Sequence, residues 1–454
     1  MEARAPLSLN LRLGYGLGAV GTGVFSTVPG LLLLFYMTNT LGISAWLAGL
    51  ALFLPKIWDV ISDPLMGILS DRTRSTWGRR RPYLLAGGLA LPLCFVLLFS
   101  TPALSPTLSF VFVLVAFTLC ATAFTVFTVP YVAMPAEMTA DYDEGTSLMS
   151  YRMAFMTVGI LAGGALAPML VKLGGGGRSG HQLMALVIAG VIGLTMIGAF
   201  LGTRRAPFER ARVDERREGW RAQVLAALRN PHYRRLVGTH FVVQIGIGCT
   251  LTNVRYVAEY LVADRGLAPE DIVTLMFVSL VLPTFVMMPP WVAVSRRVGK
   301  RRAYALSIAL FAAGTPPLWF AASAPLWCSC VAVGVMGVGF AGAQLHAFSM
   351  LPDTIQSELA LTGEQREGIF SGVWLAADKG GVALGGFLVS LVLGQTGFLE
   401  SQGERVLQPD SALTGIALNS SLLPGALFLL SLLVLRGYSL SSDELARLRA
   451  PAPR

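Results

Sequence analysis

Charged residues are scarce in this sequence. Asp, Glu, Lys and Arg make up 13% of its 454 residues, whereas about a quarter of an ordinary soluble domain is charged. Hydrophobic residues make up 54%, before the 49 glycines are counted. This composition excludes a soluble globular fold with a large aqueous domain. Since a membrane-spanning helix needs about 20 residues, the chain has room for about a dozen spans.

The sequence also lacks the marks of a disulfide-stabilised domain, a zinc site or an ATP-driven pump. Its five cysteines all fall in or beside apolar runs, where a free thiol behaves as a small hydrophobe. No Gly-rich phosphate loop is present, and no nucleophile has a base at a plausible spacing. We therefore predict a protein that is not an enzyme and that needs no cofactor.

Twelve apolar runs are long enough to cross a bilayer. They fall at residues 14–38, 44–70, 82–101, 107–135, 148–171, 181–203, 236–262, 269–294, 303–322, 327–351, 368–394 and 412–436. The longest polar stretch, with ten arginines, separates the sixth run from the seventh. We predict an all-α integral membrane protein with two six-helix bundles. The predicted parts are a first bundle at 1–203, a cytoplasmic linker at 204–235, a second bundle at 236–438 and a cytoplasmic tail at 439–454.

Basic residues lie overwhelmingly on one side of these predicted spans. If the amino terminus is inside, the inner segments hold 27 Lys and Arg residues and the outer segments hold four. Such a bias sets the orientation of membrane proteins, so both termini are predicted to be cytoplasmic. The net charge of +9 is thereby explained without a nucleic-acid partner.

Two pairs of loops repeat at nearly the same offset. GRRRPY at 78–83 and GKRRAY at 299–304 are 299 − 78 = 221 residues apart, and Gly145 and Gly368 are 368 − 145 = 223 apart. Matching offsets in equivalent loops indicate duplicated, pseudo-symmetric halves. In transporters built this way the binding site lies near the midplane, where the halves meet.

Eight charged residues lie inside the predicted spans, away from the span ends. Each costs roughly 2.5 to 3.5 kcal/mol at the centre of a membrane helix, so each needs a partner, water or a function. They are Lys56, Arg152, Arg255, Lys379, Asp59, Asp63, Glu259 and Asp378. Arg255 and Glu259 have the spacing of a local ion pair, and the others are candidates for function.

Asp59 and Asp63 lie one helical turn apart on the second span, with Ser62 beside them and Lys56 one turn earlier. Two adjacent carboxylates favour a bound cation or a proton, and oxygen ligands suit a hard cation such as sodium. The alternative is a Lys56–Asp59 ion pair with Asp63 at the bend before Pro64. We favour the cation site because Asp63 would otherwise be unpaired.

Polar residues on three other spans leave two interpretations open. Thr125 and Thr128 on the fourth span can ligate a cation or bond to their own helix. Lys379 lies too deep to reach the surface, so it pairs with its neighbour Asp378 or with the aspartates of the second span, in a functional site or in a purely structural salt bridge. Gln344 and His346 on the tenth span are either packed polar groups or solute ligands.

The segments IWDVISDPLMGILSDRTRSTWGRRRPYLL, VPYVAMPAEMTADYDEGTSLMSYR and TGEQREGIFSGVWLAADKGGVALGGFLVSLVLGQTGF resemble the glycoside-pentoside-hexuronide:cation symporters of the major facilitator superfamily. The resemblance runs from about Tyr15 to the last span. It implies twelve helices, alternating access, and uptake driven by sodium or protons.

Carried over by position, the resemblance assigns a cation site with Asp59, Asp63 and Thr125 as metal ligands and Ser62 beside them. It places Arg152 and Lys379 next to the substrate and cation sites. The remaining candidate substrate positions are Gly23, Thr128, Tyr131, Trp374, Gln344 and His346.

The sequence departs from the family's galactoside carrier in one respect. Melibiose permease has a sugar-binding aspartate on each of its first and fourth helices, and here those positions read Gly23 and Thr128. Melibiose is therefore not the expected substrate. Sodium-coupled lysophospholipid carriers resemble this family too, so an amphiphilic substrate stays open.

Charged loops suggest gating on the cytoplasmic side. Asp71, Arg72 and Arg79 follow the second span, and Asp141 and Glu144 precede the fifth. The opposite charges of these groups either stabilise the outward-facing state or only set the orientation of the protein in the membrane.

We thus predict a monomeric, multi-pass symporter of the cell membrane. Its partners would be Na⁺ or H⁺ and a small organic solute, namely a sugar, glycoside or uronide. A non-transporting membrane sensor is the alternative from another class.

Overall fold

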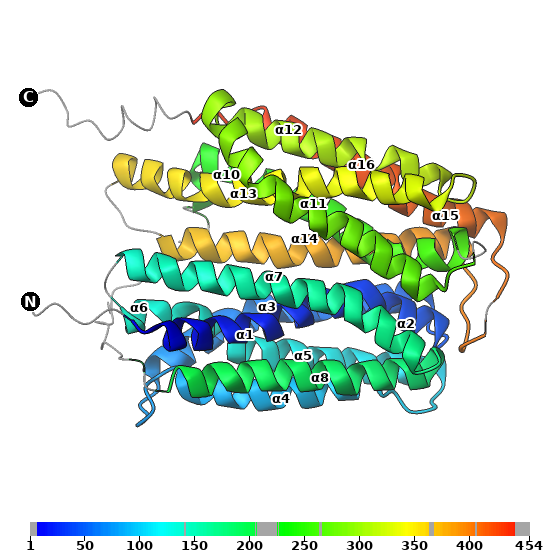
Figure 1. Cartoon of the computed structure of the whole chain (residues 1–454), viewed down its shortest axis with the longest axis horizontal. Helices are drawn as coiled ribbons and strands as arrows, with labels where there is room; N and C mark the ends of the chain where they lie inside the picture. Colours follow the sequence, from blue (N-terminus) through cyan, green and yellow to red (C-terminus); the bar gives the residue numbers. More distant parts are fainter. Residues whose placement is uncertain are drawn as a thin grey trace, which may run out of the picture. The chain divides into compact units, whose positions relative to one another are not determined.

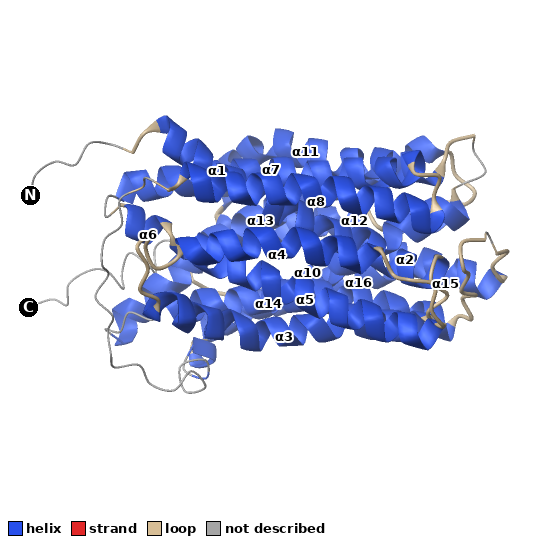
Figure 2. Ribbon diagram, turned by 90° about the horizontal axis from the view of Figure 1, so that it is seen from below, coloured by secondary structure: helices blue, strands red, loops and turns tan. Residues whose placement is uncertain are grey.

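The computed structural model describes residues 7–139, 142–204, 206, 225, 227–262, 266–362, 367–404 and 406–440. Helices are the only regular structure in this part of the chain, and it contains no strand (Figure 2). The chain divides into two compact units. The first comprises residues 1–213 with 398–407, and the second comprises residues 214–397 with 408–454.

The first unit contains nine helical elements among the described residues (Figure 1). They are α1 (Leu9–Val28), the π-helical turn η1 (Pro29–Leu33), α2 (Leu34–Asn39), α3 (Ala45–Arg72), α4 (Arg81–Phe99), α5 (Pro106–Ala133), α6 (Pro135–Met138), α7 (Tyr142–Leu173) and α8 (Gly177–Gly202), where η1 joins α1 to α2.

The second unit contains α10 (Pro231–Tyr256), the π-helical turn η2 (Val257–Leu261), α11 (Pro269–Val298), α12 (Lys300–Ala313), the 3₁₀ turn η3 (Pro316–Phe320), α13 (Leu326–Thr362), α14 (Glu367–Gln395), α15 (Asp410–Ser420) and α16 (Leu422–Leu435). A π-helical turn follows the first long helix of each unit, which is one sign that the units repeat a common plan.

Within the described residues, twelve helical stretches are long and apolar enough to cross a membrane. Each coincides with one of the twelve runs predicted from the sequence, so the predicted fold class is confirmed. Six of them belong to each unit.

The seventh span begins earlier than predicted. Helix α10 starts at Pro231, inside the predicted linker at 204–235, because the Asn230 side chain accepts hydrogen bonds from the backbone N–H groups of His232 and Tyr233. A cap and a first-turn proline fix a helix start irrespective of hydropathy. Residues 207–224 of the linker and 441–454 of the predicted tail lie outside the described part of the chain.

The helix pairings of the first unit recur in the second. Helix α1 packs against α7 and α8, as α10 packs against α14 and α16. The α3–α5 and α4–α5 pairs correspond to α11–α13 and α12–α13. The repeated loops agree as well, because Gly78 and Gly299 both adopt positive φ, at +94° and +85°. These pairings agree with the duplication read from the sequence.

Glycines bring two helix pairs into backbone contact. A Cβ atom on Gly23 of α1 would overlap the Met156 carbonyl of α7, and one on Gly248 of α10 would overlap the Val382 carbonyl of α14. These two glycines are 248 − 23 = 225 residues apart. Small residues allow such close crossings in membranes, where packing rather than the hydrophobic effect drives helix association.

The segment 398–407 belongs to the first unit, although it lies within the predicted second bundle at 236–438. Its Ser401 N–H donates to the Thr38 carbonyl at 3.0 Å, and its Ser401 hydroxyl donates to the Asn39 carbonyl at 2.9 Å. The Glu400 carboxylate accepts from the Ala45 N–H at 2.9 Å, at the start of α3. These long-range hydrogen bonds have no signature in hydropathy.

Candidate functional site

One face of α3 carries the first polar cluster. The Lys56 ammonium lies 3.2 Å from Oδ2 of Asp59, and the Asp59 and Ser62 side chains are buried. The ion pair proposed as an alternative reading of this motif is therefore present. It coexists with a further carboxylate, Asp63, four residues along the same face.

Helix α5 supplies a partner for that carboxylate. The Thr125 hydroxyl donates to Oδ1 of Asp63 at 2.6 Å, and Thr125 is buried. Its hydrogen bond thus crosses between helices rather than returning to its own backbone. This contact brings together two of the residues predicted to bind the cation.

The cluster offers oxygen atoms and one fixed positive charge. Besides both carboxylates and the Thr125 hydroxyl, it includes the buried Ser62 hydroxyl, which has no hydrogen-bond partner among the described residues. Hydroxyl and carboxylate oxygens are ligands that hard cations prefer. Lys56 already neutralises part of this charge, so a cation or a proton would share the carboxylates with its ammonium group.

A second group lies further along α5, near its end. The Tyr131 hydroxyl donates to the Tyr15 carbonyl of α1 at 2.6 Å, and the two tyrosine rings stack at 4.7 Å. The Arg152 guanidinium of α7 sits over the Tyr131 ring, 5.9 Å from its centroid. Tyr131 therefore orients Arg152 through its ring, while its hydroxyl is engaged in helix packing. The buried Oγ1 of Thr128 and Nε of Arg152 have no hydrogen-bond partner in the described part of the chain.

Gly23 lies at the crossing of α1 and α7. Because a side chain there would overlap the Met156 carbonyl, the position has no room for an aspartate. The absence of a carboxylate at position 23 thus agrees with the close packing of α1 against α7.

The second unit holds a polar cluster on α10 and α14. Oδ1 of Asp378 lies 2.5 Å from Nε2 of Gln244 and 3.0 Å from Nε2 of His240. The His240 ring stacks on Trp374 with centroids 4.0 Å apart and planes 14° apart. Sequence reasoning found Trp374 but missed His240 and Gln244. Their i, i+4 spacing within the apolar segment HFVVQ was the available signal.

Lys379 is half-buried on α14, directly after Asp378. His346 is buried on α13, where its Nδ1 lies 2.6 Å from the Gly342 carbonyl and its ring meets the Trp291 ring edge-on at 5.6 Å. These contacts place His346 in the packing of α13 against α11. Gln344 is half-buried on α13.

Arg255 makes a larger ionic cluster than the sequence indicated. It lies 3.2 Å from Glu259, as expected for a local pair, and 2.6 Å from Glu270 of α11. The cluster joins α10 to α11 and accounts for two of the charged residues in the spans.

The predicted gating residues are only partly described. Glu144 accepts hydrogen bonds from the Leu7 N–H at 2.6 Å and the Thr139 hydroxyl at 2.8 Å, and it lies 3.8 Å from Arg12. Asp141 and the side chain of Asp71 lie outside the described residues. Arg72 is exposed and Arg79 is half-buried.

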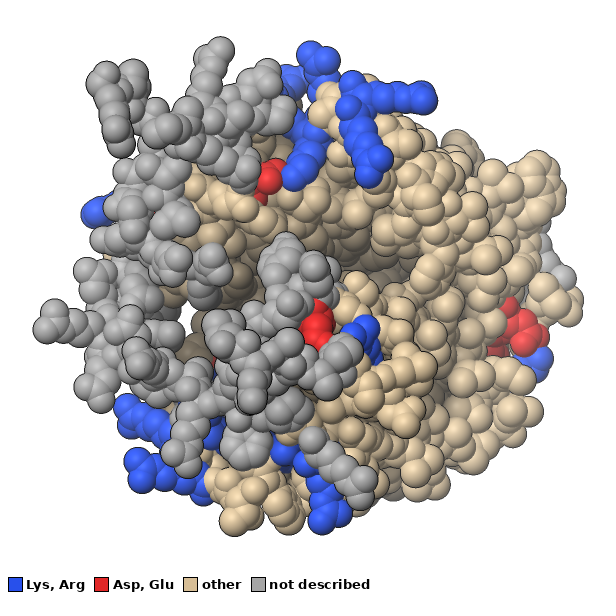
Figure 3. All heavy atoms as spheres, turned by 60° about the vertical axis from the view of Figure 1, so that its left-hand side comes forward, with Lys and Arg blue, Asp and Glu red and all other residues tan. Residues whose placement is uncertain are grey.

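Basic side chains form several patches on the face shown in Figure 3. In the first unit they come from the connection between α3 and α4, and in the second from the end of α11 and the start of α12. Arg81 is turned inward instead, and its guanidinium donates to the Arg204 and Ala206 carbonyls.

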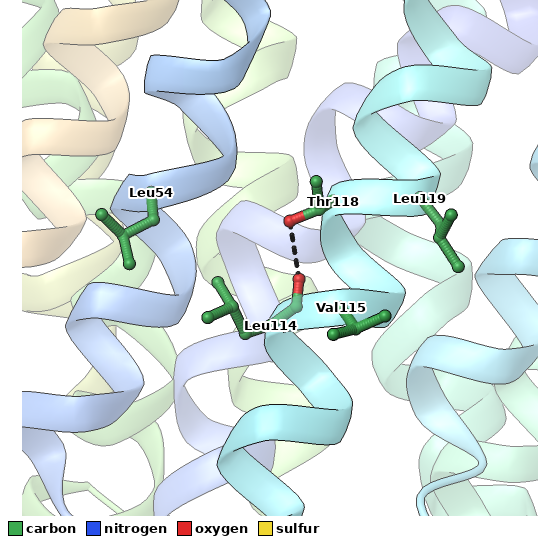
Figure 4. A pocket seen from close by; sticks show the side chains of 5 residues that line it. All are labelled: Leu54, Leu114, Val115, Thr118 and Leu119. Atoms are coloured by element: carbon green, nitrogen blue, oxygen red, sulfur yellow. Dashed lines mark hydrogen bonds between the residues drawn. The ribbon is translucent and has the colours of Figure 1, made fainter.

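A surface groove between α3 and α5 has a different character (Figure 4). Four of its five lining residues are aliphatic: Leu54, Leu114, Val115 and Leu119. The fifth, Thr118, donates its hydroxyl to the Leu114 carbonyl at 2.7 Å. The groove therefore offers a hydrophilic solute little besides the oxygen of the Thr118 hydroxyl.

Known proteins resemble this chain along nearly its whole length. A family model described as MFS/sugar transport protein matches residues 14–442. The putative glycoside/cation symporter YagG of Escherichia coli (strain K12) is 28% identical, covering 96% of this chain and 93% of its own. The isoprimeverose transporter of Lactiplantibacillus pentosus is 25% identical, covering 95% and 89%. A crystal structure of a mutant of the nucleoside transporter NupG shares the fold, with a TM-score of 0.67, 13% identity, and coverage of 95% and 99%.

Proposed function

The chain belongs to the MFS/sugar transport protein family, and on that premise we propose that it couples the entry of a cation, sodium or a proton, to the uptake of a sugar, glycoside or uronide. It is a multi-pass membrane transporter of the symporter class and not an enzyme. The coupling ion, the solute and the cytoplasmic placement of both termini are parts of the proposal.

The observation that carries the proposal is the bond between Thr125 and Asp63. It supports a cation site because it joins a carboxylate and a hydroxyl from two helices at 2.6 Å, beside the carboxylate of Asp59. A soluble ion entering this site would add positive charge beside the Asp59 and Asp63 carboxylates, of which Asp59 is already paired with Lys56. Such neutralisation favours cation binding in a medium of low polarity.

Coupling follows if cation binding alters the arrangement of charged side chains around the solute. By linkage, a solute that prefers the cation-bound form must raise the affinity for the cation by the same factor. Arg152 and Lys379 are the groups suited to meet an anionic solute, such as a uronide, or to respond to the charge at Asp63.

The solute class is inferred from the relatives and from the polar clusters. One relative is named as a glycoside/cation symporter and another as an isoprimeverose transporter. Hydroxyl, amide and carboxylate groups in the membrane interior favour a polyhydroxylated solute over an apolar one.

Transport by the purified full-length protein in proteoliposomes tests the proposal. Uptake of radiolabelled methyl β-D-xyloside, D-xylose and D-glucuronate is measured under an inward sodium gradient, an inward proton gradient, or neither. Accumulation above the external concentration under one gradient is expected. Equal uptake with and without the gradients would contradict cation coupling. If lysophosphatidylcholine, tested in the same way, is the only compound taken up, the substrate is an amphiphile rather than a sugar.

A further inference from the structure

Within the described residues, hydrogen bonds hold the Asp378 carboxylate through one oxygen atom only. Its Oδ1 accepts a hydrogen bond from Nε2 of Gln244 at 2.5 Å and another from Nε2 of His240 at 3.0 Å. The two donors come from successive turns of α10 and are buried, with exposed fractions of 3% and 1%. The Asp378 side chain is 30% exposed. The carboxylate is thus fixed through one oxygen while part of its surface stays accessible.

Two further buried polar atoms, on the side chains of Gln244 and Trp374, lack a hydrogen-bond partner among the described residues. Gln244 donates its amide N–H to Asp378, but its buried Oε1 accepts no hydrogen bond within the described residues. The buried Nε1–H of Trp374 likewise has no acceptor there. Trp374 lies one helical turn before Asp378 on α14, so the two side chains share a face of that helix.

These atoms form a set that matches hydroxyl groups. Asp378 and Gln244 present acceptors, and Trp374 presents a donor. Each hydroxyl of a sugar both donates and accepts, so adjacent hydroxyls can satisfy such a set together. Leaving buried polar atoms unsatisfied destabilises a protein, and a ligand that pairs with them gains affinity accordingly.

We propose that Asp378, Gln244 and Trp374 form a subsite for the hydroxyl groups of a neutral sugar ring, with His240 as the residue that positions Asp378. This inference rests on the proposed function and names the part of the solute that the second unit binds. It also identifies where a sugar-binding carboxylate lies in a chain whose Gly23 and Thr128 carry none. A carboxylate at position 378 repels an anionic group, so a uronide places its charge elsewhere.

His240 acts through Asp378 rather than on the sugar. Its ring is covered by Trp374 on one face, at 4.0 Å between centroids, and meets the Phe348 ring edge-on at 6.0 Å. This packing fixes the imidazole, and its Nε2 fixes the carboxylate. A glutamine at position 240 retains an N–H donor for the Asp378 carboxylate, whereas an alanine at position 240 has none.

Uptake kinetics in proteoliposomes test the subsite, with methyl β-D-xyloside and its 2-, 3- and 4-deoxy analogues as probes. For Asp378→Asn and Trp374→Phe we expect KM to rise at least tenfold, with kcat and the half-saturating cation concentration within twofold of wild type. The wild-type protein should discriminate against one deoxy analogue, and the matching variant should lose that discrimination. His240→Gln should restore most of the affinity that His240→Ala removes.

Gln395→Ala is the matched control, since Gln395 is exposed at the end of α14 and outside the cluster. If Asp378→Asn, Gln244→Ala and Trp374→Phe all keep the wild-type KM and the wild-type preference among analogues, the subsite is wrong while sugar symport stands. If the wild-type protein takes up no sugar under either gradient, the proposed function itself fails.

Discussion

Thr125 on α5 and Asp63 on α3 are joined by a hydrogen bond of 2.6 Å between a hydroxyl and a carboxylate oxygen. This distance is typical of a hydroxyl that donates to a carboxylate, and the donor is buried. It joins the polar face of α3 to α5, so a change in the charge of Asp63 alters a contact that both helices share.

Asp63→Asn should abolish cation-dependent uptake while leaving the protein folded. The amide keeps the size of the side chain but removes the charge that attracts the cation. Gradient-driven uptake is expected to fall at least tenfold, with an unchanged elution profile in size-exclusion chromatography. Normal cation-driven accumulation by this variant would rule out Asp63 as a coupling residue.

Thr125→Val should weaken cation binding without abolishing transport. A hydrogen bond to a charged group contributes roughly 1.5 to 3 kcal/mol, so the half-saturating cation concentration should rise about tenfold or more. Thr118→Val is the control on the same helix, because the Thr118 hydroxyl bonds to the Leu114 carbonyl in the apolar groove. Equal effects of the two substitutions would show that the result comes from α5 as a whole.

Lys56→Gln tests competition between the Lys56 ammonium and the soluble cation. Because Lys56 lies 3.2 Å from Asp59, its removal should increase the rise in melting temperature on exchanging choline chloride for sodium chloride. Lys300→Gln, which removes a more exposed pair with Asp353, should leave that rise unchanged. A smaller sodium effect in Lys56→Gln than in wild type would mean that Lys56 assists cation binding.

Gly23→Ala should destabilise the first unit. The added methyl group would overlap the Met156 carbonyl of α7, and overpacking costs about 1 to 3 kcal/mol. We expect a melting temperature several degrees lower and reduced yield. Gly190→Ala, at an exposed position of α8 with no neighbour within 4 Å of the new atom, should be neutral or slightly stabilising. Equal stability of the two variants would contradict the tight crossing.

Glu400→Ala should also lower stability, through loss of a helix cap. The Glu400 carboxylate accepts from Ala45 N–H at the start of α3, and a lost cap costs about 0.5 to 2 kcal/mol. The melting temperature in detergent is the readout, with the exposed residue Glu404 changed to Ala as the control. No difference between the two would show that this cap contributes nothing to stability.

Hydropathy and charge predicted the spans because the thickness of the bilayer sets the length of each apolar run. Recognising such a run requires no knowledge of how the helices pack. Helical periodicity likewise placed Asp59 and Asp63 on one face. The sequence could not show that Thr125 bonds to Asp63, because that contact depends on how two helices pack.

The cluster around Asp378 illustrates the same limit. The aspartate was visible as a charged residue inside a span and Trp374 was a candidate substrate position, but His240 and Gln244 are separated from Asp378 by more than 130 residues. Their role follows only from the packing of α10 against α14. The segment 398–407 escaped prediction for a related reason, since its bonds to the α2–α3 connection join distant parts of the chain.

The glycine crossings described above have a consequence for motion. Where backbones of α1 and α7, or of α10 and α14, lie in contact, neither helix can slide past the other without separating the pair. We therefore expect each pair to move as one rigid body. In the second unit, that body would carry Asp378 together with Gln244 and His240 and preserve their mutual geometry.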